Sequence, residues 1–151
     1  MVAVDVVAPL ARPLFGAIGG DIGTQTLVEF ARVQAAVGAL AVAQGPEQRL
    51  RAILAASFSA SNFRREVVGA WLNFYVLAQT VPDAKRLLAI YQGRLRSNLL
   101  ACLRPLSGGR AGEIAEGLGA LIDGLYLREV LKSGLPDGAA AVETAMEYLN
   151  S

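Results

Sequence analysis

The chain contains no histidine and only one cysteine among its 151 residues. The absence of histidine excludes the commonest general base, the Ser–His and Cys–His catalytic pairs and most zinc sites. The single thiol, Cys102, excludes an internal disulfide, is typical of a reducing compartment, and sits in a helical pattern that predicts a buried structural role. We find no nucleophile–base pair, phosphate loop or metal-ligand spacing, and therefore expect no enzyme, no cofactor and no metal site.

Charge is also scarce. Charged residues make up 18% of the chain and the formal net charge is +1, with no long basic run, so nucleic-acid binding by this chain alone is not predicted. The longest charge-free stretch, 67–82, is shorter than the roughly 20 residues that span a bilayer. The apolar N-terminus lacks a basic region and contains Asp5, which argues against a signal peptide. We expect a cytoplasmic protein that does not contact membranes.

Apolar side chains are abundant by contrast, because hydrophobic residues make up 54% of the chain. A domain of this size buries roughly two-thirds of the surface that its unfolded chain exposes. Some of the excess apolar surface is therefore expected outside the core of the monomer, which predicts a partner chain. The alternative is a helical protein that is simply rich in alanine and leucine.

The apolar residues recur with helical periodicity, and no alternating strand pattern of useful length occurs. Gly45 followed by Pro46 and the sequence Val81-Pro82 are typical helix boundaries, and Pro105 with Ser107-Gly108-Gly109 is expected to end a helix. The segment 134–138 is a strong turn signal. The polar break 59–62 is expected to supply an N-cap to the helix that follows it. The resulting prediction is an all-α chain of six helices, at about 25–44, 46–58, 63–80, 83–103, 110–132 and 138–149.

The fifth predicted helix, 110–132, is apolar on nearly every side. Gly117 and Gly124 lie seven residues apart and therefore on one face. Because glycine costs about 1 kcal/mol relative to alanine in a helix, this pattern favours close approach of another backbone. We predict a symmetric dimer interface formed by the fifth and sixth helices, with close packing inside the monomer as the alternative. The predicted interface residues are Gly117, Leu118, Leu121, Gly124, Leu125 and Met146.

Aromatic residues suggest a binding site. Trp71, Phe74 and Tyr75 cluster on one side of the third predicted helix, and Tyr91 and Tyr126 are the aromatics expected to approach them from the fourth and fifth. Aromatic rings with a nearby acid such as Asp123 hold quaternary ammonium groups through cation–π attraction and charge. The alternative is that these rings are ordinary core.

Asp123 itself allows three interpretations. It pairs with an arginine, for which Arg94, Arg96 and Arg128 are candidates, it faces solvent, or it lines a pocket. A buried carboxylate without a partner or a ligand is too costly to be retained, so the third interpretation implies a ligand. Composition and periodicity do not choose among the three.

Four segments carry a resemblance to a known family. PEQRLRAILAASF (46–58), GAWLNFY (69–75), LLAIYQGRLRSNLL (87–100) and GLGALIDGLYLR (117–128) resemble the C-terminal domain of TetR-family transcriptional repressors. The nearest type is the choline-responsive, BetI-like repressor of glycine betaine synthesis. The resemblance covers about 46–149 in near-continuous register and extends weakly over 25–44, so the expected domain is 25–151.

The resemblance implies a ligand-binding and dimerisation domain whose last two helices form a four-helix bundle with those of a second copy. It also implies a pocket among the middle helices for choline or a similar small cation, and hence an effector-sensing role in transcriptional repression. The alternatives are a helical dimerisation or interaction module without a ligand, and an inactive truncated subunit that forms heterodimers with a full-length repressor.

The first 24 residues depart from the family pattern. Family members carry a helix-turn-helix domain there, which requires basic phosphate contacts and a recognition helix. Residues 1–24 contain Arg12 as their only base, against Asp5 and Asp21, and are short and glycine-rich. We expect an unassigned leader without a helix-turn-helix, so that DNA contact would require a domain absent from this chain.

Overall fold

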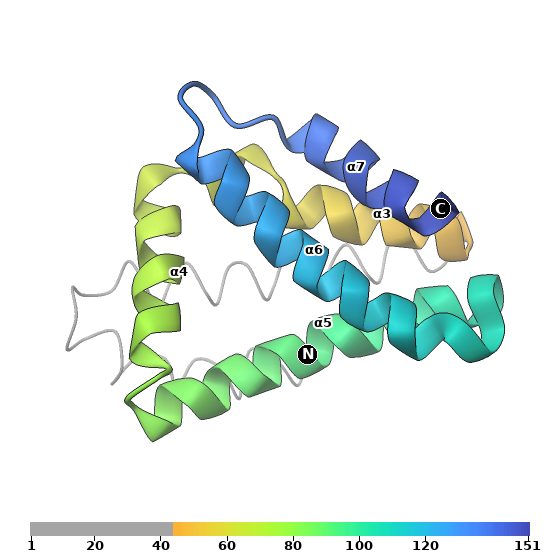
Figure 1. Cartoon of the computed structure of the whole chain (residues 1–151), viewed down its shortest axis with the longest axis horizontal. Coiled ribbons are helices and arrows are strands. Elements are labelled where there is room, and N and C mark those ends of the chain that lie inside the picture. The colour runs from red at the N-terminus through yellow and green to blue at the C-terminus, as the bar shows by residue number, and fades with distance from the viewer. Residues whose placement is uncertain (1–43) are drawn as a thin grey trace.

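The computed structural model describes residues 44–151, and every regular element in that range is helical. Five α-helices are connected by short loops and two 3₁₀ helices (Figure 1). In chain order the elements are α3 (Pro46–Ser57), η2 (Ala60–Phe63), α4 (Arg65–Leu77), α5 (Pro82–Ser107), η3 (Gly108–Arg110), α6 (Ala111–Leu131) and α7 (Gly138–Asn150).

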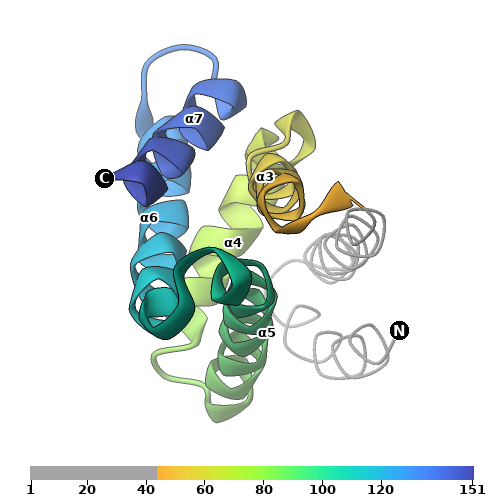
Figure 2. The same ribbon diagram turned by 90° about the vertical axis from the view of Figure 1, so that its right-hand side faces the viewer.

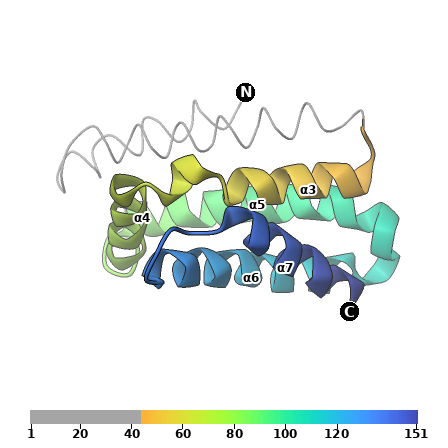
Figure 3. The ribbon, with the colours of Figure 1, turned by 90° about the horizontal axis from the view of Figure 1, so that it is seen from above.

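The four helices α3, α5, α6 and α7 form two layers. Seen from above, α3 and α5 lie in one layer and α6 and α7 in the other (Figure 3). Helix α5 packs against both α3 and α6, and α7 packs against both α6 and α3, so each layer is joined to the other at two places (Figure 2). Helix α4 crosses one end of this bundle and contacts mainly α5 and η2 (Figure 1).

Helix starts follow local chemistry. Pro46 and Pro82 each occupy the first turn of a helix, where a missing N–H costs nothing. Gly45, with φ of 94°, supplies the left-handed backbone that leads into α3. The side chain of Asp137 caps α7 by accepting a hydrogen bond from the backbone N–H of Ala140 at 3.0 Å.

Gly138, the first residue of α7, lies directly against the end of α3. A Cβ atom at this position would overlap the backbone carbonyl oxygen of Phe58. No L-amino acid with a side chain fits there without a shift of backbone. The glycine therefore sets how closely α7 approaches α3.

Two apolar clusters fill the molecule. The larger lies between the two layers and is aliphatic, with Leu50, Ile53, Leu54, Leu99 and Leu118 fully buried. The smaller lies beneath α4 and is rich in aromatic residues. Tyr126 packs against both clusters, so it marks their boundary.

The described residues bear out the all-helical prediction. The helices expected at 46–58, 63–80, 83–103, 110–132 and 138–149 correspond to α3, α4, α5, α6 and α7. The helix expected at 25–44 and the leader 1–24 lie outside the described residues, so the count of six stays a prediction.

Two boundary predictions need correction. Helix α5 ends at Ser107, at the expected break Ser107-Gly108-Gly109, but Pro105 does not end it, because the proline removes only one N–H within the last turn. The break 59–62 gives no side-chain N-cap to α4. Its Asn62 instead serves the preceding helix, donating from Nδ2 to the carbonyl oxygens of Ala56 at 2.8 Å and Ser57 at 3.2 Å.

No helix within 44–151 is long and apolar enough to cross a membrane.

Candidate functional site

A small cavity of about 30 Å³ lies where the smaller cluster meets α6. Its walls come from the end of α3, from η2 and from helices α4, α5 and α6. The lining residues are Ser57, Asn62, Trp71, Tyr75, Tyr91, Ile122, Asp123 and Tyr126.

Trp71 is the centre of the aromatic wall. Its ring centroid lies 5.0 Å from that of Tyr91 and 5.9 Å from that of Tyr75, with interplanar angles of 52° and 36°. These are ordinary tilted aromatic contacts, so the rings also stabilise one another. Trp71 and Tyr75 lie one turn apart on α4, and Tyr91 comes from α5. The three rings therefore surround a common space.

Tyr126 forms the opposite wall and is held in place from two sides. Its hydroxyl donates to the backbone carbonyl of Asn62 at 2.8 Å, and its ring stacks on Phe63 with centroids 5.4 Å apart. Burial raises the pKa of Tyr126 to about 12. The phenol is therefore neutral at physiological pH and serves as a hydrogen-bond donor.

Among the described residues, Asp123 brings the only carboxyl group to the cavity lining. Burial among these side chains raises its pKa, and the hydrogen bond with the Tyr75 hydroxyl acts in the opposite direction. The pKa of Tyr75 is raised in turn, first by burial and then by the negative charge of Asp123. The tyrosine hydroxyl thus donates to the carboxylate and remains protonated.

Of the three interpretations of Asp123, the structure combines two. The residue lines the cavity and is also exposed to solvent on its other side. Within 44–151 no arginine or lysine forms an ion pair with it. Arg96 pairs with Glu116 instead, and so the carboxylate has no cation from the described part of the chain.

A second, larger hollow also borders Asp123. This groove of about 410 Å³ lies between α5 and α6, and its lining includes the same Tyr91 and Asp123 that line the cavity. Arg96 and Glu116 lie along it. The two hollows therefore share one wall, made of a tyrosine and an aspartate.

The structure brings together five of the six residues predicted to bind a ligand. Phe74 is the exception. It is 1% exposed and packs within the cluster beneath α4, with its ring edge-to-face against Trp71 at a centroid distance of 6.0 Å. The residues in the cavity are Trp71, Tyr75, Tyr91, Asp123 and Tyr126.

Sequence reasoning missed Ser57, Asn62 and Ile122. Asn62 had a visible signal, because a lone amide within a polar break often bonds to backbone carbonyls. The contribution of Ser57 depends on the place where α3 ends. Its hydroxyl donates to the carbonyl oxygen of Ile53 at 2.9 Å, and no sequence motif indicates that it faces a cavity.

The predicted interface residues are placed differently. Leu118 and Met146 lie in the core of the chain itself, 0% and 5% exposed, and so offer no surface to a partner in this structure. Gly117 accommodates Tyr148 of α7, whose hydroxyl would overlap a Cβ atom at that position. The close approach that its glycine permits is thus made within the monomer.

The other three interface residues leave the prediction open. Leu121 and Leu125 are partly buried against the larger core. Gly124 faces open space, because an added Cβ atom would meet nothing within 4 Å. Exposed apolar side chains nevertheless occur nearby, with Leu127 at 42%, Leu131 at 71% and Leu135 at 96% exposure.

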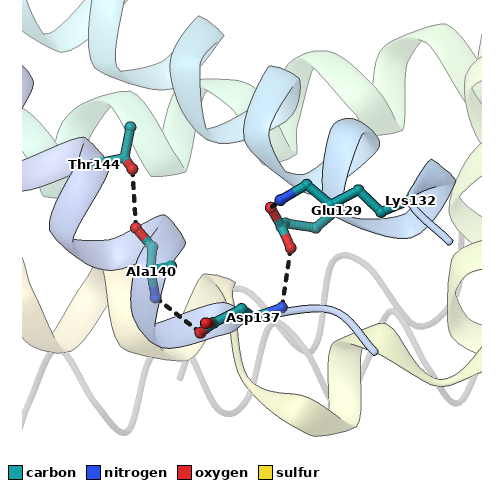
Figure 4. A network of polar contacts seen from close by, with 5 residues as sticks. All are labelled: Glu129, Lys132, Asp137, Ala140 and Thr144. Atoms are coloured by element: carbon teal, nitrogen blue, oxygen red, sulfur yellow. Dashed lines mark hydrogen bonds and ion pairs between the residues drawn. The ribbon is translucent and has the colours of Figure 1, made fainter. Parts of the chain in front are cut away.

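The turn between α6 and α7 is fixed by Glu129. This buried carboxylate forms an ion pair with Lys132 and accepts a hydrogen bond from the backbone N–H of Asp137 at 2.9 Å (Figure 4). The hydrogen bond from Lys132 is the largest of the contacts that lower the pKa of Glu129. The same residue that caps α7, Asp137, is thereby tied to α6.

The fold has a close counterpart among solved structures. A crystal structure of a transcriptional regulator from Pseudomonas aeruginosa PAO1 aligns with a TM-score of 0.70 and 25% sequence identity, over 85% of this chain and 66% of that one. This likeness supports the arrangement of the helices.

Sequence comparison is more specific. The HTH-type transcriptional regulator BetI of Brucella suis (strain ATCC 23445 / NCTC 10510) is 49% identical over 112 residues, which cover 74% of this chain and 57% of the relative. BetI of Agrobacterium fabrum is 51% identical, covering 72% and 54%. The chain therefore spans a little more than half the length of these curated relatives, all of which are transcriptional regulators rather than enzymes.

The family model of the BetI-type transcriptional repressor C-terminal domain matches residues 46–151, which include every α-helix of the described structure. This range also holds every residue that lines the cavity. The chain belongs to the BetI-type C-terminal family of TetR transcriptional repressors.

Proposed function

We propose that this chain is the effector-sensing and dimerisation part of a BetI-like repressor, and that its effector is choline or a related small cation. The observation that carries the proposal is Asp123, a carboxylate in a cavity of aromatic rings that has no cation partner within 44–151. An organic cation in the cavity would supply the missing partner.

The chemistry of the walls favours a quaternary ammonium group. Such a group has no N–H to donate, so proteins bind it with aromatic faces and negative charge. Because the pKa values of Tyr75, Tyr91 and Tyr126 are all raised, these phenols stay neutral, and within 44–151 Asp123 alone supplies negative charge to the lining. Each ring–cation contact stabilises the bound state by about 0.5–2 kcal/mol.

The size of the cavity adds a requirement. Small-molecule pockets usually measure about 300–1,000 Å³, whereas this cavity holds about 30 Å³. A trimethylammonium group therefore enters only if the lining side chains move apart. A binding event that forces such movement is suited to an effector, since the liganded and unliganded forms of the domain must differ.

The dimerisation part of the proposal rests on exposed apolar surface. Leu127 and Leu131 project from the end of α6, and Tyr148 of α7 is 44% exposed. A helix end with this much apolar surface favours burial against a second copy. A dimerising module without a ligand is the second candidate function, because these residues would serve it equally well. A cytoplasmic location follows for either role in transcription.

The intrinsic fluorescence of Trp71 provides the test. It is the only tryptophan in the chain and lies in the cavity wall, so its emission reports occupancy directly. We expect choline to change this emission saturably, and its uncharged isostere 3,3-dimethylbutanol to bind at least about tenfold more weakly because the charge term is lost. Equal affinity for the two compounds, or no response to either, would reject the cation site.

A pair of matched variants sharpens the test. Asp123→Asn removes the charge in the cavity while keeping the shape of the side chain, and should abolish the preference for choline over its isostere. Asp83→Asn removes an exposed acid from the first turn of α5, outside the cavity, and should leave the preference intact. Loss of preference in both variants would point to a long-range charge effect instead.

A further inference from the structure

The cavity and the groove between α5 and α6 meet at a single wall. Tyr91 and Asp123 line both hollows, the inner of about 30 Å³ and the outer of about 410 Å³. Asp123 is exposed, while its hydroxyl partner Tyr75 lies on the cavity side. The carboxylate thus stands at the boundary between solvent and the interior.

The remaining described walls of the cavity are tied into the fold. Trp71 is 5% exposed and packs against Phe74, and behind it lies the cluster beneath α4. Asn62 is fastened to two carbonyl groups of α3, and Tyr126 is fastened to Asn62.

We propose that the groove is an outer binding site and the entrance through which a small organic cation reaches the cavity, with Asp123 as the acid common to both. The proposal rests on the proposed function and adds to it an entry route and an outer binding site. A cation first occupies the groove next to Asp123 and then passes inward as the Tyr91–Asp123 wall opens.

The charges along the groove agree with this direction of movement. Arg96 and Glu116 neutralise each other as an ion pair, so the remaining charge on the lining is the carboxylate of Asp123. A concave surface with one dominant charge raises the local concentration of counterions and speeds their capture. A cation is therefore drawn to the end of the groove that adjoins the cavity.

Small residues keep the groove open. Gly93 of α5 and Gly119 of α6 both line the groove, and a Cβ atom added at either position would meet nothing within 4 Å. Glycine inside a helix costs about 1 kcal/mol relative to alanine, and here no packing contact requires it. The two glycines therefore leave space in the groove that larger side chains would fill.

These glycines allow the entrance to be narrowed without disturbing the core. Gly119→Phe and Gly93→Leu should fill part of the groove, and neither should lower the thermal unfolding midpoint, because both replace a helical glycine in open space. Gly112→Phe is the matched control. It lies on the same helix α6, its added Cβ atom also meets nothing within 4 Å, and it does not line the groove.

The measurement is stopped-flow fluorescence of Trp71 with choline. If the groove is the entrance, Gly119→Phe and Gly93→Leu should slow association and dissociation together, by about tenfold for the larger side chain, with the dissociation constant changed less than about twofold. Gly112→Phe should keep the wild-type rates. At high choline concentration, binding to the outer site should appear as a second, faster phase in fluorescence or calorimetry. This phase should be lost in Gly119→Phe.

The possible failures are distinct. Wild-type rates in both groove variants, or faster dissociation with unchanged association, would overturn the entrance while choline binding itself stands. Absence of any choline response in the wild-type chain would overturn the proposed function and the entrance together.

Discussion

The two apolar clusters differ in what they are made of. Between the helical layers the side chains are aliphatic and fully buried, and they fill the space around Leu54 and Leu118. Beneath α4 the side chains are aromatic, an acid is present, and a hollow remains. The first region has the composition of a core whose task is stability. The cluster beneath α4 is incompletely packed next to Asp123, where the carboxyl group is accessible to a ligand.

The same contrast extends to how the helices are held. Among the described elements, helices α3, α5, α6 and α7 each pack against at least two other helices, whereas α4 contacts mainly α5 and η2. A helix held on fewer sides opens locally at a lower free-energy cost. The cavity borders this helix, so its expansion around a bound cation, as distinct from the entry of the cation past Tyr91 and Asp123, need not disturb the aliphatic core.

The largest expected effect tests the aliphatic cluster. Leu54→Ala should lower the free energy of unfolding by about 3–5 kcal/mol, because it removes a fully buried side chain and leaves a void. Urea denaturation measures the change. Leu72→Ala removes a leucine that is 36% exposed on α4 and should cost about 1 kcal/mol or less. Similar costs at the two positions would erase the distinction between the regions.

The next prediction concerns the outer end of α6. Leu131→Glu places a charge on a side chain that is 71% exposed, so it should leave the fold intact and weaken a dimer by about tenfold or more. Light scattering over a dilution series measures the dimer. Leu106→Glu, at 50% exposure near the end of α5, is the control and should have no effect. A dimer unaffected by Leu131→Glu would assign the interface to another surface.

Asp123→Asn should also change how stability depends on pH. Because the pKa of Asp123 is raised in the folded chain, its ionisation opposes folding, and stability is lost as pH rises from about 3.8 through the folded pKa. The variant lacks this loss and should be the more stable protein at pH 7, with the two converging below the unfolded pKa. Chemical denaturation at several pH values tests this. A less stable variant at pH 7 would show that the ionised carboxylate already has a stabilising partner.

Glu129→Gln should show the opposite dependence. The pKa of Glu129 is lowered by its hydrogen bond from Lys132 and by the backbone N–H of Asp137, so its stabilising contribution is present above the usual value of 4.5 and disappears as pH falls through the folded pKa. The variant should be less stable at pH 7 and match the wild type in acid. Amide exchange in the turn 132–137 would localise the change. An equal difference at both pH values would mean that charge is not the cause.

Tyr75→Phe is expected to have the smallest effect. The ring stays, but the hydrogen bond that lowers the pKa of Asp123 is lost, so that pKa should rise further. Choline affinity should be nearly unchanged at pH 8. As the pH is lowered, Asp123 becomes protonated, and choline affinity should begin to fall at a higher pH in the variant than in the wild type. A fluorescence titration across pH reads this shift. An unaltered pH profile would show that the Tyr75 hydroxyl does not influence the carboxylate.

Much of the fold was predictable because it depends on local signals. Prolines at the starts of α3 and α5, and the turn signal at 134–138 before α7, gave helix boundaries close to the observed ones. Pro105 misled because a proline beyond the first turn removes a backbone hydrogen bond of the helix, yet α5 tolerates this loss in its last turn and continues to Ser107. Helix existence follows from periodicity, whereas the exact end depends on tertiary contacts.

The site was predictable to the extent that it uses rare residues. Trp71, Tyr75 and Asp123 stand out because aromatic and acidic groups are few, and their helical spacing restricts where they can point. Phe74 shares that spacing but turns into the cluster beneath α4, and Leu118 and Met146 turn into the larger core. Periodicity indicates that a face is apolar, but it does not say which neighbour covers it. Asn62 contributes through its hydrogen bonds to backbone carbonyls of α3; its place in a polar break signals such bonds but does not indicate that the residue faces a cavity.

The contact between Gly138 and the carbonyl of Phe58 has a mechanical consequence. Backbone packs directly against backbone there, with no side chain between them that could rearrange, so the start of α7 cannot move closer to the end of α3. The adjacent Asp137 is tied to α6 through Glu129, which extends the same constraint to a third helix. Helices α3, α6 and α7 are thus connected at this corner, so that a displacement of one of them there would also displace the other two.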